Sequence, residues 1–161
     1  MNNRQIKIVF GALIAFYMAM VCFNNITDYD SNFQFVGMVS GMGDVFSKDK
    51  TGWRAIHSDT LHHIMYAFII LLELTITILT LSGTLKMLRK LNSSSVEFNQ
   101  AKKLILTGIS LGVILWFGVF IAIGGEWFLM WQSKNWNGQN TAFFLTLCFL
   151  LFLIYISRPD D

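Results

Sequence analysis

The chain has 161 residues, of which 54% are hydrophobic and 14% are charged, and it contains a single proline. This composition is far more apolar than that of an average soluble domain, and a formal net charge of +2 is too small to indicate nucleic acid binding. The apolar residues form blocks long enough to cross a hydrocarbon core of about 30 Å. Because these blocks are too long and too uniform for barrel strands, we predict an all-α membrane protein, a single domain with four transmembrane helices over residues 1–161.

The first apolar block covers residues 6–23 and is just long enough to span a bilayer. Gly11, Ala15 and Ala19 recur every four residues and form a stripe on which another helix could pack closely. The residues before Cys22 fit no signal-peptide cleavage site, so we expect this block to remain as an anchor.

The segment 24–60 combines charged residues with large apolar side chains such as Phe33 and Trp53. A disordered linker would hold few aromatic residues, so this mixture favours a structured loop on the outer side of the membrane.

The second apolar block, residues 61–85, contains Glu73 near its middle. A carboxylate at that depth costs about 2.5–3.5 kcal/mol, so it should face the interior of the bundle, paired or protonated. At helical spacing His62, Tyr66, Glu73 and Thr77 fall on one face and form a polar stripe. Two interpretations remain open: a proton relay or polar ligand cavity, and a structural hydrogen bond between helices.

The third block, residues 104–125, carries Gly108 and Gly112 at the spacing that lets helix backbones touch. A polar, tryptophan-rich connection follows at 126–140, and the last block is 141–157. Basic residues are more numerous on the side of the termini and of the 86–103 connection, so both termini are predicted to be cytoplasmic.

The two outer segments, 24–60 and 126–140, are predicted to pack together into a cap. Four of the five tryptophans lie in or beside these segments, together with many amide side chains that supply donors and acceptors. We also consider an ion pair between Arg54 and Glu126. The candidate residues of this outer cap are Asp28, Arg54, Glu126, Trp127, Trp131 and Trp136.

Several motifs in the outer segments resemble a known family. They are Asn24-Asn25-Ile26-Thr27-Asp28-Tyr29, Asn32-Phe33-Gln34-Phe35-Val36, Trp53-Arg54-Ala55-Ile56, Gly124-Gly125-Glu126-Trp127-Phe128, Met130-Trp131-Gln132-Ser133 and Trp136-Asn137-Gly138-Gln139. Over nearly the whole chain the sequence resembles the domain of unknown function numbered 2165, a family of small bacterial inner-membrane proteins. The resemblance implies four helices in the bacterial inner membrane and no activity. A histidine that often follows the Phe-Val of the first loop in that family is replaced here by Gly37-Met38-Val39, so no metal role can be carried over.

No catalytic motif is present, and we predict no metal site and no cofactor. Adjacent histidines such as His62 and His63 point about 100° apart on a helix, which does not form a one-face metal pair. The favoured function is a non-enzymatic oligomer or an accessory subunit of a larger membrane assembly, whose partners are lipid and either a second copy or another membrane protein. The alternatives are a proton-coupled small transporter or channel using Glu73, and a quinone or redox-ligand site near His62, Tyr66 and Trp116.

Overall fold

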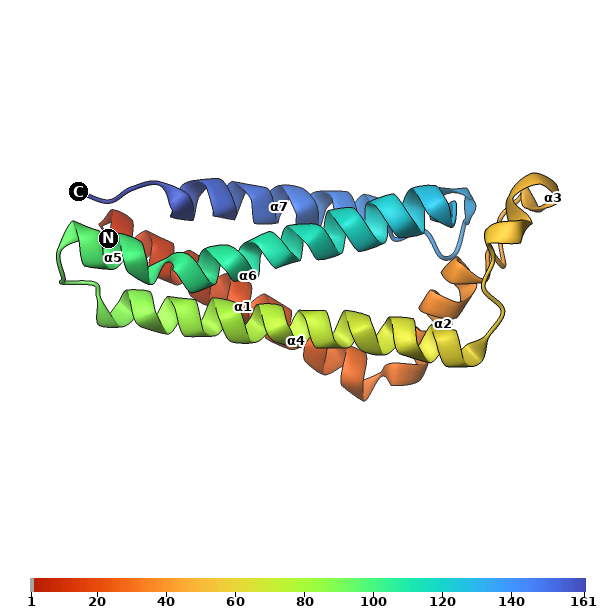
Figure 1. The fold of residues 1–161 in the computed structure, drawn as a ribbon, viewed down its shortest axis with the longest axis horizontal. Helices are drawn as coiled ribbons and strands as arrows, with labels where there is room; N and C mark the ends of the chain where they lie inside the picture. Colours follow the sequence, from red (N-terminus) through yellow and green to blue (C-terminus); the bar gives the residue numbers. More distant parts are fainter. Residues whose placement is uncertain (1) are drawn as a thin grey trace.

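The computed structural model describes residues 2–161, and every regular element among them is a helix (Figure 1). Three long helices are α1 (Asn3–Thr27), α4 (Asp59–Arg89) and α7 (Gln139–Ser157). A fourth run, Ser95–Trp127, is made of α5 (Ser95–Ala101), α6 (Lys103–Val113) and the π-helix η2 (Ile114–Trp127). All four runs are long and apolar enough to cross a membrane.

Short elements gather at one end of this bundle, which we call the loop end (Figure 1). They are α2 (Tyr29–Ser40), α3 (Lys48–Thr51), η1 (Gly52–Arg54) and η3 (Met130–Gln132). Both termini lie at the opposite end, which we call the terminal end.

The helices extend beyond the apolar blocks from which the spans were predicted. Asn24 and Asn25, which the sequence placed in the first loop, belong to α1, whose backbone hydrogen bonds continue until the amide of Asp28 binds the carbonyl of Asn24. A helix ends where its backbone pairing ends, and polar residues in its last turns do not stop it. This extension brings Asn25 into the bundle.

Side-chain caps fix the starts of three of these helices. Asn2 accepts a hydrogen bond from the amide of Gln5, whose side chain accepts from the amide of Asn2 in return, a capping box. Ser58 and Ser94 cap α4 and α5 in the same way, each accepting from an amide three residues further on. Local sequence therefore sets where these helices begin.

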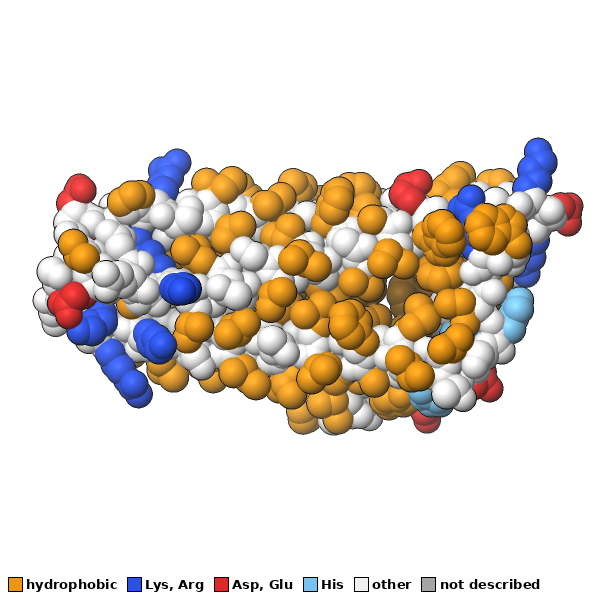
Figure 2. Space-filling view, viewed as in Figure 1, with side chains coloured by type: hydrophobic (Ala, Val, Ile, Leu, Met, Phe, Trp, Pro, Cys, Tyr) orange, Lys and Arg blue, Asp and Glu red, His pale blue; other side chains and the backbone are white. Residues whose placement is uncertain are grey.

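Large apolar side chains cover the outside of the bundle between its two ends (Figure 2). Phe16, Leu71 and Leu151, from three different helices, are each more than 60% exposed. A soluble monomer rarely exposes a continuous apolar surface of this extent, whereas a bilayer solvates it favourably. The outer surface is thus that of a membrane protein.

Small residues let the helices approach closely inside the bundle. Gly11 of α1 faces Thr84 and Ile105, Gly108 of α6 faces Thr80, and Gly112 faces the ring of Phe149 on α7. Ala15 is buried as well, and Ala19 is partly exposed. The predicted small-residue stripes are thus occupied by contacts within one chain.

Gly83 provides a test of this packing, because a Cβ there would meet the backbone of Ile105. We expect Gly83→Ala to lower the free energy of unfolding by about 1–3 kcal/mol, since a helix backbone cannot move aside as a side chain can. The control is Gly118→Ala on η2, where the nearest atom would lie 3.8 Å away. Thermal unfolding in detergent measures both variants, and equal melting temperatures would contradict the close approach of α4 and α6.

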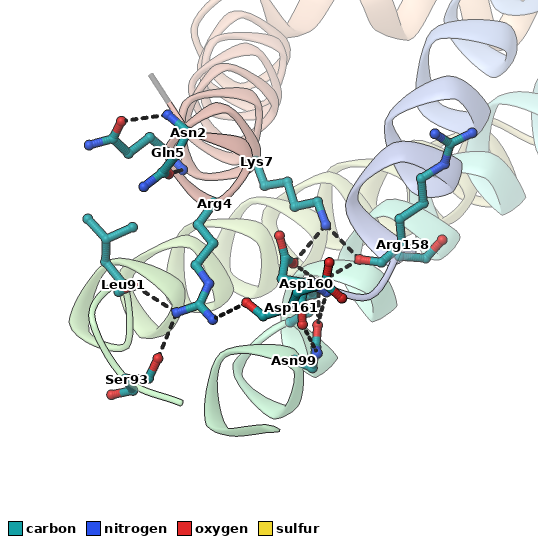
Figure 3. A network of polar contacts seen from close by, with 12 residues as sticks. Asn2, Arg4, Gln5, Lys7, Leu91, Ser93, Asn99, Arg158, Asp160 and Asp161 are labelled. Carbon is teal, nitrogen blue, oxygen red and sulfur yellow. Dashed lines mark hydrogen bonds and ion pairs between the residues drawn. The ribbon is translucent and has the colours of Figure 1, made fainter. Parts of the chain in front are cut away.

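A buried ionic network closes the terminal end (Figure 3). Lys7 of α1 and Lys102, between α5 and α6, both pair with the Asp160 carboxylate, and the Lys7 Nζ to Asp160 Oδ2 distance is 2.7 Å. The two ammonium groups also donate to the carbonyl of Arg158, at 2.6 and 2.7 Å. Arg4 donates to the carbonyls of Leu91, Ser93 and Asp161. These contacts hold the C-terminal tail against α1 and against the start of the Ser95–Trp127 run.

Candidate functional site

Glu73 lies inside the bundle and is only 1% exposed. It shares the buried face of α4 with Tyr66, Ile69 and Ile76, which follow one another at helical spacing. Both of its carboxylate oxygens accept hydrogen bonds from the Asn25 amide nitrogen, each at 2.8 Å. A residue in the last turn of α1 therefore holds the intramembrane carboxylate.

Tyr66, on the same face of α4 as Glu73 but nearer the loop end, also contacts Asn25. Its hydroxyl donates to the backbone carbonyl of Asn25 at 2.7 Å. Asn25 thus contacts α4 twice, through its side chain at Glu73 and through its backbone at Tyr66. Asn25 is a residue of the candidate site that sequence reasoning missed, because it was assigned to the loop.

A cavity of about 420 Å³ opens beside Glu73, bounded by residues of α1, α2, α4, η2 and α7. Its wall combines aromatic, aliphatic and amide side chains, and five of the fourteen lining residues are aromatic. The aromatic residues are Tyr17, Phe35, Tyr66, Trp116 and Phe120, and the amide residues are Asn24, Asn25 and Asn32. Among residues 2–161, no lysine, arginine or histidine lines this cavity, and Glu73 is the one carboxyl side chain in its lining. A volume of this size suits a small organic ligand.

Trp116 lines the cavity and carries a buried polar atom without a partner. Its side chain is buried, and its indole nitrogen has no hydrogen-bond partner in the described part of the chain. Buried donors are nearly always paired, so an unpaired one calls for a specific explanation. A ligand or water that accepts from this N–H would satisfy it.

Trp116 and Phe120 both belong to η2, the π-helix. π-helical turns are rare and are frequent at functional sites, because the wider turn repositions side chains relative to an α-helix. A smaller apolar cavity of about 60 Å³ adjoins this helix and shares Phe35, Ile69 and Phe120 with the Glu73 cavity. Figure 2 shows a hollow in the apolar surface toward the loop end, between α4 and η2, which line this smaller cavity.

Two residues of the predicted polar stripe do not line the Glu73 cavity. The Thr77 hydroxyl donates to the carbonyl of Glu73 within α4, at 2.8 Å. His62 is buried nearer the loop end, where its Nε2–H donates to the carbonyl of Ile56 at 2.9 Å. His63 stacks on Phe33 and hydrogen-bonds the Tyr29 hydroxyl. Within residues 2–161, no three His, Cys, Asp or Glu side chains are grouped so as to hold a metal ion.

Comparison with known families matches this chain from residue 3 to residue 159 with DUF2165, described as a predicted small integral membrane protein. The chain belongs to the DUF2165 family. No curated protein and no solved structure gave a significant match. The family description names no activity, so the function of this DUF2165 protein has to be argued from its site.

In this DUF2165 protein the two segments of the loop end contact each other. The Asp44 carboxylate accepts from the Ser133 hydroxyl at 2.8 Å, and the Gln132 side-chain oxygen accepts from the Ser47 hydroxyl at 3.1 Å. Beneath these bonds, Met42, Val45 and Phe128 form a small buried cluster. The contacts between the connections before α4 and before α7 are therefore both polar and apolar.

Arg54 lies between two tryptophans in this region, with its guanidinium carbon 5.4 Å from the ring of Trp53 and 5.2 Å from that of Trp127. It donates to the backbone carbonyl of Trp127, and no ion pair with Glu126 occurs in residues 2–161. The Glu126 side chain is exposed, and Arg54 is half-buried against the two aromatic rings, with its Nε unpaired in the described part of the chain.

The other predicted cap residues lie around this contact. Trp131 packs edge-on against Phe46, and Trp136 lies beside Phe35 from α2. Asp28 follows the end of α1, where its backbone carbonyl accepts from the Asn32 side chain. Trp136 thereby connects the loop end to the wall of the Glu73 cavity, because Phe35 lines that cavity.

Asp44 offers a test of the contact between the two loops. The Ser133 hydroxyl, together with the nearby backbone amides and Lys134, holds the pKa of Asp44 below its ordinary value despite the opposing effect of burial. We expect Asp44→Ala to accelerate protease cleavage within residues 128–138, because it removes the charged acceptor of these hydrogen bonds. Lowering the pH through the pKa of Asp44 should accelerate cleavage of the wild type for the same reason. Asp49→Ala, at an exposed carboxylate of α3, is the control. Equal cleavage rates for the two variants would contradict this role.

Proposed function

We propose that this protein is a proton-coupled transporter of a small molecule, with the Glu73 cavity as its substrate site. The observation that supports this function best is a buried carboxylate without a cationic partner, facing a cavity of ligand size. An intramembrane carboxylate that is not neutralised by the protein exchanges a proton or a cation with its surroundings.

The packing of the bundle favours a carrier over an open channel. Between Glu73 and the terminal end, side chains occupy the space beside the glycines. Thr84 and Ile105 lie against Gly11, Ile105 lies against Gly83, and the Phe149 ring lies against Gly112. A second cavity of about 240 Å³ between α1 and α7 shares Tyr17 and Leu145 with the Glu73 cavity. Neither cavity is lined by a residue of the buried network at the terminal end, so passage to the other side requires a rearrangement of the helices.

We further propose that the protein resides in the bacterial inner membrane with both termini in the cytoplasm. The charge asymmetry supports this orientation. The terminal end carries Arg4, Lys7, Lys86, Arg89, Lys90, Lys102, Lys103 and Arg158, and the loop end carries Lys48, Lys50, Arg54 and Lys134.

Proton flux into vesicles tests the transport function. Purified protein is reconstituted around a trapped pH-sensitive dye, a pH gradient is imposed, and candidate amphiphiles are added. Wild-type protein should show substrate-stimulated proton movement that Glu73→Gln abolishes, because glutamine keeps the shape and loses the titratable group. Glu97→Gln, at an exposed carboxylate of α5, should behave as the wild type. Unchanged flux in Glu73→Gln would refute this function.

A second candidate function is that of an oligomer or an accessory subunit. Exposed aromatic side chains at the loop end support it, namely Phe46 at 76% and Trp53 at 72% exposure. Aromatic residues are enriched at protein interfaces and also at the membrane interface. A photo-crosslinking residue placed at position 53 in native membranes distinguishes a protein interface from a membrane interface. Adducts with lipid alone would count against a protein partner.

A further inference from the structure

We infer that the ligand of the Glu73 cavity is an amphiphile with one cationic group, an ammonium or comparable group attached to an apolar body, and that it enters from the bilayer between α1 and α7. This inference rests on the proposed function of the cavity and specifies its substrate class.

The charge of the cavity selects a cation. Glu73 is the one carboxyl side chain among the lining residues, no basic side chain lines the cavity, and the amide of Asn25 orients the carboxyl group without supplying a counter-charge. The other titratable side chains that line the cavity are Tyr17 of α1 and Tyr66 of α4, and Cys22 of α1 lies near Glu73. Tyrosine and cysteine side chains are ordinarily neutral at physiological pH. From α2, η2 and α7 the described lining adds no titratable group. One negative charge therefore matches one positive charge or one proton.

The aromatic wall favours an organic cation over a hydrated metal ion. Five of the fourteen residues that line the cavity are aromatic, namely Tyr17, Phe35, Tyr66, Trp116 and Phe120. The faces of aromatic rings attract alkylammonium groups, which carry little bound water, and the attraction grows when the site is desolvated. An inorganic cation would require several oxygen ligands, and the cavity has one carboxylate with a few scattered amides.

The way into the cavity runs through the side of the bundle. At the terminal end α1 and α7 touch through Phe10, whose ring lies 5.2 Å from Phe152 and 5.4 Å from Tyr155. Toward the loop end the two helices diverge (Figure 1), and the exposed residues Tyr17 and Thr141 form part of the cavity rim. A ligand that enters through a lipid-facing side must itself dissolve in the bilayer, which accounts for the apolar body. The natural source of such a ligand is either a free amphiphilic amine or the ammonium headgroup of a phospholipid.

A matched pair of probes tests the charge requirement. Benzyltrimethylammonium and its neutral carbon isostere, neopentylbenzene, have nearly the same shape and differ by one charge. Binding to the full-length protein in nanodiscs of phosphatidylglycerol is measured by calorimetry in two buffers of different ionisation enthalpy, which reports proton release. We expect the cation to bind about tenfold or more tighter than the isostere and to release protons at acidic pH.

The variants and lipids then assign the site and the source. Glu73→Gln should abolish the preference for the cation, and Glu97→Gln should retain it. If phosphatidylethanolamine in the nanodisc competes with the cation, the inference is supported and the ligand is a lipid headgroup. If this lipid does not compete, the inference is supported and the ligand is a free cation. Equal binding of the two probes to the wild type would overturn the inference while leaving the cavity a neutral ligand site. Failure of both probes to bind would overturn it too, and the vesicle proton-flux assay then decides separately whether the transport function stands.

Discussion

Replacing Asn25 with leucine is expected to destabilise the protein by about 1–3 kcal/mol, and by more if Glu73 is ionised, because the buried carboxylate loses its side-chain donor. Both oxygens of Glu73 accept from this one amide. The Tyr66 hydrogen bond is to the backbone carbonyl of Asn25 and remains available in the variant. The variant therefore removes the hydrogen bonds to the Glu73 carboxylate and keeps the contact at Tyr66.

The double variant Asn25→Leu/Glu73→Leu should recover most of this stability. Replacing both partners of a buried polar pair with apolar groups is nearly neutral, and leucine is favourable inside a membrane span. Thermal unfolding in detergent of the wild type, both single variants and the double variant forms a complete cycle. Asn24→Leu, at the exposed neighbouring amide, is the control. Effects that simply add in the double variant would show that Asn25 and Glu73 do not interact energetically.

The double variant also separates stability from function. A folded protein that lacks both polar groups should show no proton-coupled flux, since the titratable group is gone. A stable double variant with full flux would place transport elsewhere in the molecule.

Replacing Asp160 with asparagine should lower the free energy of unfolding by about 3–5 kcal/mol, because it leaves two buried ammonium groups without a counter-charge. The side chains of Lys7, Lys102 and Asp160 are all less than 5% exposed. The control is Asp161→Asn, since Arg4 binds the backbone carbonyl of Asp161 and that carbonyl is unchanged. A melting temperature of Asp160→Asn equal to that of Asp161→Asn would contradict a role for the network in stability.

The same network predicts how stability depends on pH. Burial alone would raise the pKa of Asp160, but hydrogen bonds and charges from Lys102 and Lys7 outweigh it and hold the pKa below its ordinary value. A carboxyl whose pKa is depressed by folding contributes stability above its unfolded pKa of about 4, and that contribution is lost as the pH falls through the folded pKa. We expect the wild type to lose stability on acidification over this range, and Asp160→Asn to lose less. Melting temperatures of both proteins between neutral and acidic pH measure the difference.

Much of the fold follows from local sequence. Each apolar block is long enough to span, and a helix satisfies its own backbone in lipid, so four helices could be predicted without knowing how they pack. The buried position of Glu73 could be predicted for the same kind of reason, because a carboxylate facing lipid would be too costly. The predicted helix ends were less accurate, because Asn24 and Asn25 are polar and yet belong to α1.

The partners of the buried polar groups could not be predicted from sequence. Asn25 and Glu73 are 48 residues apart, and Lys7 and Asp160 are 153 apart. Spacing along one helix indicated that Thr77 shares a face with Glu73, but its hydroxyl binds the backbone of its own helix. Likewise, opposite charge suggested that Arg54 pairs with Glu126, whereas Arg54 lies between two tryptophan rings.

The sequence by itself thus determined that the chain is a bundle of membrane helices with one carboxylate in its interior, because hydrophobic length and the cost of a buried charge are local properties. Only the tertiary structure decided that Asn25 holds this carboxylate, that Trp116 lines the same cavity, and that Asp160 joins two buried lysines. Those contacts depend on the crossing and rotation of whole helices, which are set by how glycines such as Gly83 and Gly112 allow neighbouring helices to approach.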